Sequence, residues 1–341
     1  MEAIIDFVLL SFLIVIAFAV IYMKDLFAVV MLSGIYSLLS ASFFVALDAV
    51  DVAFTEAAVG AGISTLLMLI VISMTGRSEN TTRHKPLPAL IVVSITGALL
   101  IFGTLDMPYF GITDAPIHQH VAPRYIEESM QEIGIPNIVT SVLASYRAFD
   151  TLGELVVIFT ACTGVLALLS FNSKTNRNDK SLSVSMHKQH LVIRIVAKIL
   201  IPFILLFALY VQFHGDFGPG GGFQAGVIFA AAIILYTMLF GLSAAQKALN
   251  PSLILLITAL GVLLFTCVGL TSLLLGGNFL NYNVLADLPV IGQHLGILII
   301  ELGVGCTVAA VMILIFFNFA NQREQLKQKH KQVKDSQELS P

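Results

Sequence analysis

Charged residues are scarce in this chain of 341 residues. Only 11% of the residues are Asp, Glu, Lys or Arg, whereas 57% are hydrophobic, and the mean hydropathy is +0.92. An ordinary soluble domain carries about 25% charged residues. This scarcity excludes an ordinary soluble protein and predicts an integral membrane protein.

Cysteine is also rare. The three cysteines, Cys162, Cys267 and Cys306, each lie inside an apolar run, with no CxxC spacing and no histidine nearby in the sequence. This pattern is typical of small packing residues rather than of metal ligands or a disulfide. We expect no cofactor, no permanent metal ion and no nucleic-acid partner.

Long apolar runs dominate the chain instead. A helix needs about 20 apolar residues to cross a hydrocarbon core about 30 Å thick. Runs of this length favour helices over the alternating strands of a membrane barrel. The sequence therefore predicts an all-α, polytopic membrane protein with nine spans, near residues 3–23, 26–47, 53–74, 88–105, 151–171, 194–213, 222–243, 252–276 and 293–318.

The basic residues predict the orientation. With the C-terminus in the cytoplasm, all 18 Lys and Arg residues except Arg124 and Arg147 lie on that side, as the positive-inside rule requires. Nine spans then place the N-terminus outside. Residues 106–136 become an external loop with a short interfacial helix, residues 172–192 a cytoplasmic linker between modules, and residues 321–341 a helix-prone cytoplasmic tail that frays at its end.

The clear candidates among the acids inside predicted spans are Glu56, Glu154 and Glu301. A charged side chain at membrane depth costs about 2.5–3.5 kcal/mol, so such residues are candidates for a functional role. No lysine lies deep in any predicted span. The acids must therefore be protonated, or meet a cation from another subunit or from solution, and we expect transient Na⁺ at Glu56 and Glu154.

Glu56 lies in "DAVDVAFTEAAVGAGISTLL", among small residues that allow close helix packing. Asp48, Asp51 and Thr55 share one face of this helix and predict an acidic external mouth that leads to Glu56. In the alternative interpretation, the two aspartates are loop and capping residues, and Glu56 only bonds a neighbouring helix.

Glu154 shares a helix face with Arg147 and Asp150, which predicts a relay for protons or cations. The alternative is a local ion pair between Arg147 and Asp150. Glu301, which has glycines beside it, either faces the ion pathway or bonds a hydroxyl group on the next helix.

The stretch "HGDFGPGGGFQAG", residues 214–226, interrupts two apolar runs with glycines that cannot continue a helix cheaply. Exposed backbone groups near membrane depth are tolerated only beside protein or a water-filled cavity, so the break predicts a polar cavity. The candidate residues are His214 and Asp216 at its mouth, the break Pro219, Gly220, Gly221, Gly222 and Phe223, and Gln224 just inside the next helix. The alternative is a tight interhelical turn.

The break also contains a GxGxxA pattern, but it follows an apolar helix rather than a strand, which excludes a dinucleotide site.

Three motifs carry a family resemblance. The glycine break, preceded by "VIRIVAKILIP" and followed by "IELGVGCTVAAVM", resembles the MnhB/MrpB subunit of multisubunit Mrp-type Na⁺/H⁺ antiporters and its counterpart in membrane-bound hydrogenases. The stretch "DAVDVAFTEAAVGAGISTLL" resembles an MbhD-like module, and "NIVTSVLASYRAFDTLGELVVI" resembles an MbhE-like module.

The resemblance implies an MbhD-like module of three spans at residues 1–80, an MbhE-like module of two spans at 86–173, and an MnhB-like module of four spans at 190–320. It also implies that Glu56, Glu154, Pro219 and Phe223 belong to the family's cation and proton pathway. The large antiporter-like domain found beside such modules in the family's largest chain is not in this sequence. The implied partners are therefore a separately encoded antiporter-like chain and small membrane subunits, in the lipid of a bacterial inner membrane.

The function expected from this resemblance is that of a non-enzymatic membrane subunit of a monovalent cation (Na⁺)/H⁺ antiporter. Two alternatives remain open. The same modules can form the ion-coupling arm of a membrane-bound hydrogenase or complex-I-like oxidoreductase, or a structural scaffold whose acids stabilise helix contacts.

Overall fold

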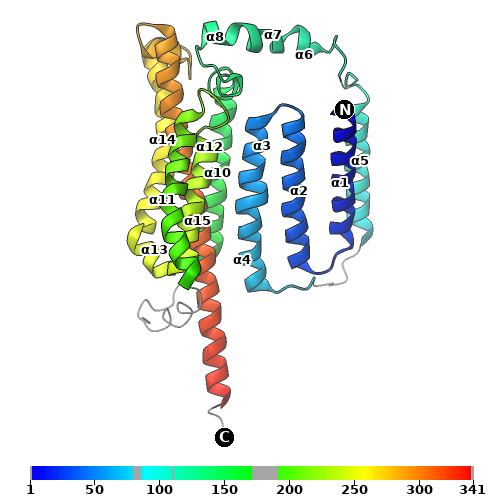
Figure 1. Ribbon diagram of the computed structural model, residues 1–341, viewed down its shortest axis with the longest axis vertical. Helices are drawn as coiled ribbons and strands as arrows, with labels where there is room; N and C mark the ends of the chain where they lie inside the picture. Colours follow the sequence, from blue (N-terminus) through cyan, green and yellow to red (C-terminus); the bar gives the residue numbers. More distant parts are fainter. Residues whose placement is uncertain (1, 80–85, 110, 171–190, 339–341) are drawn as a thin grey trace.

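The computed structural model describes residues 2–79, 86–109, 111–170 and 191–338 (Figure 1). The predicted linker at 172–192 lies outside these residues apart from its last two. Within the described ranges, nine helical segments are long and apolar enough to cross a membrane, which confirms the predicted all-α fold. The helices that make up these segments are α1 (Glu2–Tyr22), α2 (Leu26–Ala46), α3 (Val50–Glu56), α4 (Thr65–Thr75), α5 (Pro86–Thr104), α10 (Ala148–Ser170), α11 (Leu191–His214), α12 (Gly222–Phe240), α14 (Pro251–Leu274) and α15 (Pro289–Glu338). Helices α3 and α4 belong to the same segment.

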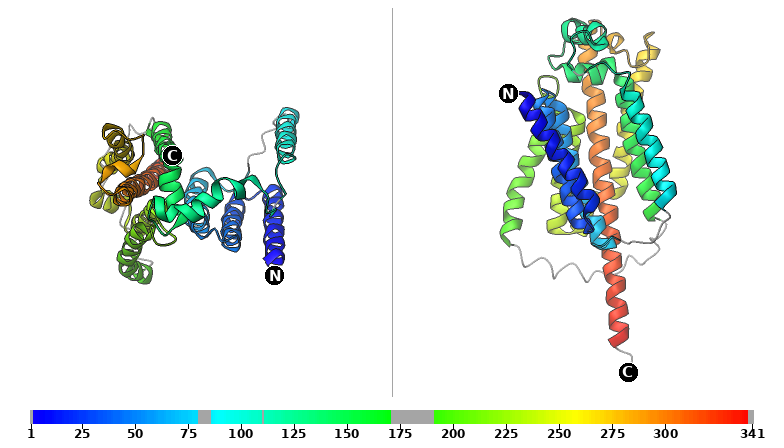
Figure 2. Two further views of the ribbon diagram at one scale, coloured as in Figure 1. Left: turned by 90° about the horizontal axis from the view of Figure 1, so that it is seen from above. Right: turned by 90° about the vertical axis from the view of Figure 1, so that its right-hand side faces the viewer.

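The helices form two groups. Helices α1 to α4 lie side by side, and α10 to α15 form a bundle next to α3 and α4 (Figure 1). Helix α5 stands apart from both groups when the molecule is seen from above (Figure 2). Neither α1 nor α5 has a buried residue within the described part of the chain. Most of their apolar side chains therefore face the surroundings of the protein, although one side of α1 packs against α2.

The third span is not a plain α-helix. Between α3 and α4 lies the π-helical segment η1, Ala57–Ser64, with the sequence "AAVGAGIS". Its two glycines weaken α-helical preference, and π-helical turns inside helices frequently mark functional sites. The hydropathy pattern predicts the span but not this wider turn.

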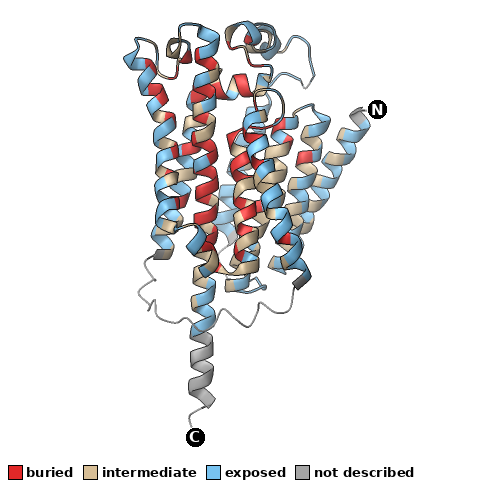
Figure 3. Cartoon of the chain, turned by 60° about the vertical axis from the view of Figure 1, so that its left-hand side comes forward, coloured by how far each residue is buried: buried red, intermediate tan, exposed pale blue. Residues whose placement is uncertain are grey.

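Helix α15 is the centre of the bundle. Ile297, Ile300, Val304, Val308 and Val311 are buried at spacings of three and four residues, which gives one continuous apolar stripe. Figure 3 shows buried segments, in red, along the helix that runs on to the C-terminus. The helix continues without a break beyond the bundle to Glu338, so most of the predicted tail is an extension of α15.

Helices α12 and α15 approach closely at Gly222. A Cβ atom there would overlap the carbonyl oxygen of Glu301, and one at Gly226, a turn later, would lie 2.7 Å from the carbonyl oxygen of Gly305. Small residues four apart are a common contact between membrane helices. The contact places Glu301 directly beside the glycine break.

The loop of residues 106–136 crosses one end of the molecule (Figure 1). In place of the single predicted helix it has four short turns: α6 (Pro116–Gln119), α7 (Val121–Pro123), η2 (Arg124–Glu128) and α8 (Ser129–Glu132). The segments α7, η2 and α8 follow one another without a gap. Pro116 begins α6 and Pro123 lies in the first turn of the second stretch, where a missing N–H removes no helical hydrogen bond. The chain then enters α9 (Ile138–Ser141), the π-helical η3 (Val142–Tyr146) and α10.

A polar cluster holds this loop to η3. The hydroxyl of Tyr146 donates a hydrogen bond to Glu132, and Arg124 Nη2 lies 2.9 Å from Glu132 Oε1. These two donors lower the pKa of Glu132 from its ordinary value of 4.5, and burial together with Glu132 raises the pKa of Tyr146 to about 12. The cluster is therefore strongest with Glu132 ionised.

Acidification is expected to loosen the loop. Because the folded-state pKa of Glu132 is depressed, its contribution to loop docking is complete above the ordinary carboxyl pKa and is lost as pH falls through the folded value. Hydrogen exchange of residues 121–135, measured at about pH 6 and about pH 3 and divided by the intrinsic amide exchange rate at each pH, should show less protection at the lower pH. In Glu132→Gln, protection should already be low at the higher pH. Equal protection of the wild-type loop at both pH values would contradict the prediction.

Candidate functional site

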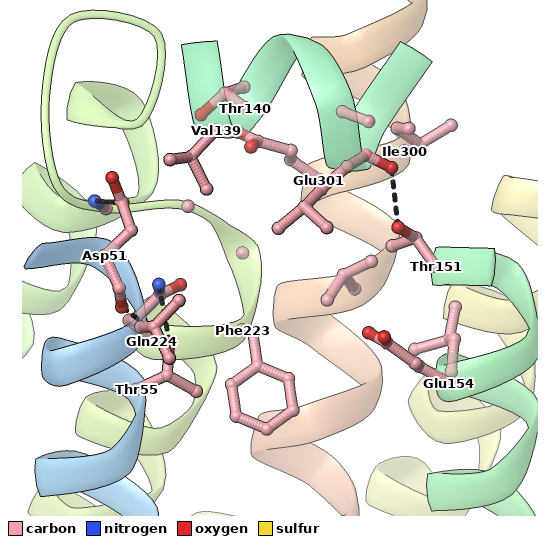
Figure 4. A pocket seen from close by; sticks show the side chains of 18 of the residues that line it. Asp51, Thr55, Val139, Thr140, Thr151, Glu154, Phe223, Gln224, Ile300 and Glu301 are labelled. Carbon is pink, nitrogen blue, oxygen red and sulfur yellow. Dashed lines mark hydrogen bonds between the residues drawn. The ribbon is translucent and has the colours of Figure 1, made fainter. Parts of the chain in front are cut away.

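A cavity of about 580 Å³ lies where three parts of the chain meet. Its walls come from α3, from α9 to α10, and from the start of α12 with the middle of α15 (Figure 4). The polar side chains that line it are Asp51, Thr55, Thr140, Thr151, Glu154, Gln224 and Glu301.

The glycine break forms one wall of the cavity. The N–H of Gly221 donates to the carbonyl of Val211 at 3.0 Å, and the N–H of Gly220 donates to Asp51 Oδ1 at 3.0 Å. Gly221 has φ +123°, a conformation that a residue with a Cβ rarely adopts. The break therefore satisfies its backbone within the protein, as predicted for irregular structure at membrane depth.

A second contact joins α3 to α12. Gln224 Nε2 donates to Thr55 Oγ1 at 2.9 Å, and Thr55 Oγ1 in turn donates to the carbonyl of Asp51 at 3.0 Å. Gln224 is buried. Together with the bond from Gly220 to Asp51, these contacts fix α3 against the glycine break.

Three carboxylates border the cavity: Asp51 from α3, Glu154 from α10 and Glu301 from α15. None of the described residues that line it is Lys, Arg or His. In Figure 4 the ring of Phe223 extends between Thr55 and Gln224 on one side and Glu154 on the other. An apolar cavity with acidic groups and no basic group attracts cations and repels anions.

The three acids differ in their partners. Asp51 is buried, and both of its oxygens accept hydrogen bonds, from Gly220 N and from Asn137 Nδ2. Within the described parts of the chain, no group donates a hydrogen bond to the carboxylate of Glu154 or Glu301. Glu301 is half-buried and is stable there when it carries a proton or a bound cation, whereas Glu154 is exposed. Glu154 and Glu301 are therefore suited to exchange ions, whereas Asp51 is suited to hold α3 against the glycine break.

The structure brings together many of the predicted site residues. The cavity is lined by Asp51, Thr55, Glu154, Gly220, Gly221, Gly222, Phe223, Gln224 and Glu301. Six predicted residues lie outside its lining: Asp48, Glu56, Asp150, His214, Asp216 and Pro219. Asp48 is an exposed turn residue with φ +58°, and Pro219 is exposed on the loop.

Glu56 faces away from the cavity. A Cβ on Gly60 would lie 2.8 Å from Glu56 Oε1 and would also overlap the Ser37 hydroxyl of α2, so Glu56 and Ser37 meet at the same point. The predicted continuous path from Asp51 through Thr55 to Glu56 is therefore divided, because Glu56 lies on the α2 side of its helix.

The other outlying residues have local partners. Asp150 pairs with Arg147 at 2.6 Å, which is the local ion pair proposed above as an alternative. The imidazole of His214 stacks on Tyr210 with ring centres 4.8 Å apart. Asp216 Oδ2 lies 3.6 Å from His294 Nδ1. None of these contacts involves a residue that lines the cavity.

Sequence reasoning missed Asn137, Thr140, Thr151 and His294. Thr140 Oγ1 donates to the carbonyl of Gly215 at 2.7 Å, and His294 Nε2 lies 3.1 Å from the carbonyl oxygen of Gly134. Uncharged side chains carry no conspicuous signal in a hydropathy profile. The sequence offered a signal only for Asn137, because an asparagine that follows a proline and precedes an apolar run is typical of a helix N-cap.

Three family models match successive parts of the chain. The MbhD model, which describes the D component of MBH, matches residues 11–77, and the MbhE model, which describes the E component, matches residues 91–187. The model described as a domain related to the MnhB subunit of Na⁺/H⁺ antiporter matches residues 192–314. The putative antiporter subunit mnhB2 of Staphylococcus aureus (strain Newman) is 30% identical over 141 residues, which are 40% of this chain and 99% of that protein. The chain belongs to the MnhB family.

Two further relatives cover more of this chain. The probable K⁺/H⁺ antiporter A/B subunit of Rhizobium meliloti (strain 1021) is 24% identical over 84% of this chain and 31% of that protein. The structure of the Mrp complex from Dietzia sp. DQ12-45-1b matches with a TM-score of 0.74 and 26% identity, over 92% of this chain and 34% of that chain. This MnhB-family chain thus spans about a third of these larger relatives.

A solved redox complex is also similar. A chain of the membrane-bound sulfane sulfur reductase, an archaeal respiratory membrane complex, matches with a TM-score of 0.52 and 30% identity. The match covers 69% of this chain and 98% of that chain.

Proposed function

We propose that this chain is a membrane subunit of a monovalent cation/proton antiporter complex, and that the cavity between α3, α10, α12 and α15 is part of its ion pathway. The observation that carries the proposal is the cavity itself, with three carboxylates and no basic group among its described lining residues. The names of the relatives support the reaction class, since they are described as antiporter subunits. Na⁺ is the first cation to test.

The proposal includes partners and a membrane. The relatives that resemble this chain over most of its length are about three times longer. We propose as partners an antiporter-like chain and small membrane subunits of an Mrp-type complex, which supply the remainder of the pathway. The exposed apolar helices α1 and α5 provide surfaces for such subunits or for lipid. We place the complex in a bacterial inner membrane, with the loop of residues 106–136 outside.

All three modules contribute to the cavity. We assign residues 1–80, 86–173 and 190–320 as the MbhD-like, MbhE-like and MnhB-like modules. Each supplies one cavity acid, namely Asp51, Glu154 and Glu301 in that order. A cation or proton in the cavity is therefore shared by all three modules, which explains why they act together. Glu56, on the α2 side, is proposed as a carrier further along the pathway.

The variant Glu154→Gln tests the pathway directly. Glutamine keeps the shape of glutamate but can neither release a proton nor neutralise a cation. In vesicles that contain the assembled complex, Na⁺-driven proton flux measured with a pH-sensitive dye should fall at least about tenfold, which corresponds to about 1.4 kcal/mol. Asp287→Asn is the matched control, because Asp287 is an exposed acid outside the cavity.

The outcome also separates a pathway from a scaffold. If Glu154 only stabilises helix contacts, the variant should lower the yield of the complex and leave the flux per complex unchanged. Full flux in the assembled Glu154→Gln complex would count against the proposal.

A redox-driven complex is the second candidate, and the sulfane sulfur reductase match is the observation that favours it. In that case the same cavity would couple ion movement to electron transfer in other subunits. Purifying the intact complex and analysing it for iron–sulfur proteins distinguishes the two, because an antiporter of the proposed kind contains none.

A further inference from the structure

Asn137 is the N-cap of α9. Its Oδ1 accepts a hydrogen bond from the N–H of Val139 at 3.0 Å, and this bond fixes the orientation of the side-chain amide. The NH₂ group therefore points away from α9. It points toward the glycine loop and α3.

The NH₂ group of Asn137 lies among three oxygen atoms. Nδ2 is 2.9 Å from the carbonyl oxygen of Gly215, 3.0 Å from that of Gly218 and 3.4 Å from Asp51 Oδ2. The backbone N–H of Asn137 also donates to the carbonyl of Asp216 at 3.0 Å. One residue between the loop and α9 thus contacts both the glycine loop and the first acid of the cavity.

Two hydrogens serve these three acceptors. An NH₂ group has two N–H donors, so it cannot serve all three acceptors fully at the same time. The bond to Asp51, at the longest of the three distances, therefore competes with the bonds to the loop carbonyls. The other oxygen of Asp51 accepts from the N–H of Gly220. Asp51 and the glycine loop are consequently held to each other at two points, one direct and one through Asn137.

We propose that Asn137 is a positioning residue that holds the Asp51 carboxylate and the glycine loop in register, and thereby sets the cation concentration at which the cavity fills. The inference rests on the proposed function of the cavity. Asn137 does not line the cavity, so it acts through Asp51 and the loop rather than on the ion.

Two variants remove the NH₂ group and keep the cap. Asn137→Ser retains a side-chain oxygen for the N–H of Val139, and Asn137→Asp retains both that oxygen and the shape of the side chain. In vesicles with the assembled complex, Asn137→Ser should raise the Na⁺ concentration for half-maximal proton flux about tenfold, as expected for loss of a hydrogen bond to a charged group. The maximal flux should change much less.

Asn137→Asp should have the larger effect, because it places a second carboxylate at the position now 3.4 Å from Asp51. The matched control is Asn250→Ala. Asn250 caps α14 through its bond to the N–H of Ser252 but lies outside the cavity lining, so the half-maximal concentration should stay at the wild-type value.

The results distinguish this inference from the proposed function. If Asn137→Ser and Asn137→Asp assemble and keep the wild-type half-maximal concentration while Glu154→Gln loses flux, the positioning role is wrong and the pathway stands. If the Asn137 variants lower only the amount of complex, the residue is structural and the inference is overturned. If Glu154→Gln also keeps full flux, the pathway itself is refuted.

Discussion

Replacing Glu301 with glutamine is expected to reduce Na⁺-driven proton flux by about 100-fold, which corresponds to about 2.7 kcal/mol. Glu301 is half-buried between the glycine break and α10, and a Cβ on Gly221 would lie 3.2 Å from its Oε1. Its carboxylate accepts no hydrogen bond within the described parts of the chain, so a proton or a cation is its available partner. Glutamine supplies the same shape without the charge.

Glu324→Gln is the matched control for this variant. Glu324 lies on the same helix and is exposed, outside the cavity lining. Flux in vesicles should be normalised to the amount of assembled complex, measured by gel filtration. An assembled Glu301→Gln complex with wild-type flux would contradict the assignment of Glu301 to the pathway. Loss of flux in both variants would point to an effect of charge on the whole helix.

Gly222→Ala is expected to cause the largest loss of stability. The added Cβ would overlap the carbonyl oxygen of Glu301, which is backbone and cannot move aside without shifting α15. Overpacking of this kind costs about 1–3 kcal/mol. The temperature at which the complex dissociates, measured by size-exclusion chromatography after heating, should fall by several degrees, and flux should fall with it because Glu301 moves.

Gly153→Ala and Gly164→Ala in α10 are the controls. Nothing lies within 4 Å of a Cβ added at either position, and alanine is a better helix former than glycine. Both control variants should keep or raise the dissociation temperature. A Gly222→Ala complex as stable as these controls would show that α12 and α15 tolerate a larger separation than the structure has.

The arrangement gives the glycine break a physical role. It ends α11, exposes the N–H of Gly220 to Asp51, and lets α12 approach α15 closely enough to place Glu301 at the cavity wall. A polar cavity and a tight interhelical turn are therefore not exclusive alternatives, because the break is both. Close packing and the polar wall arise from the same glycines.

Much of the fold follows from the sequence alone. The nine spans were predictable because each apolar run is long enough to cross a bilayer, and a backbone in lipid must satisfy its own hydrogen bonds as a helix. The presence of the loop at residues 106–136, of the glycine break and of acids within the spans follows from the same reasoning.

Other features were decided by tertiary contacts. Glu56 and Asp51 are five residues apart, yet one faces α2 and the other the cavity, and the π-helical turn that follows them is invisible to hydropathy. Asn137 carries no charge, so only its position among Gly215, Gly218 and Asp51 reveals a role. The sequence determined which segments enter the membrane and which acids go with them. The packing of α3, α10, α12 and α15 decided which of those acids meet, because side chains distant in the chain come together only through the approach of their helices.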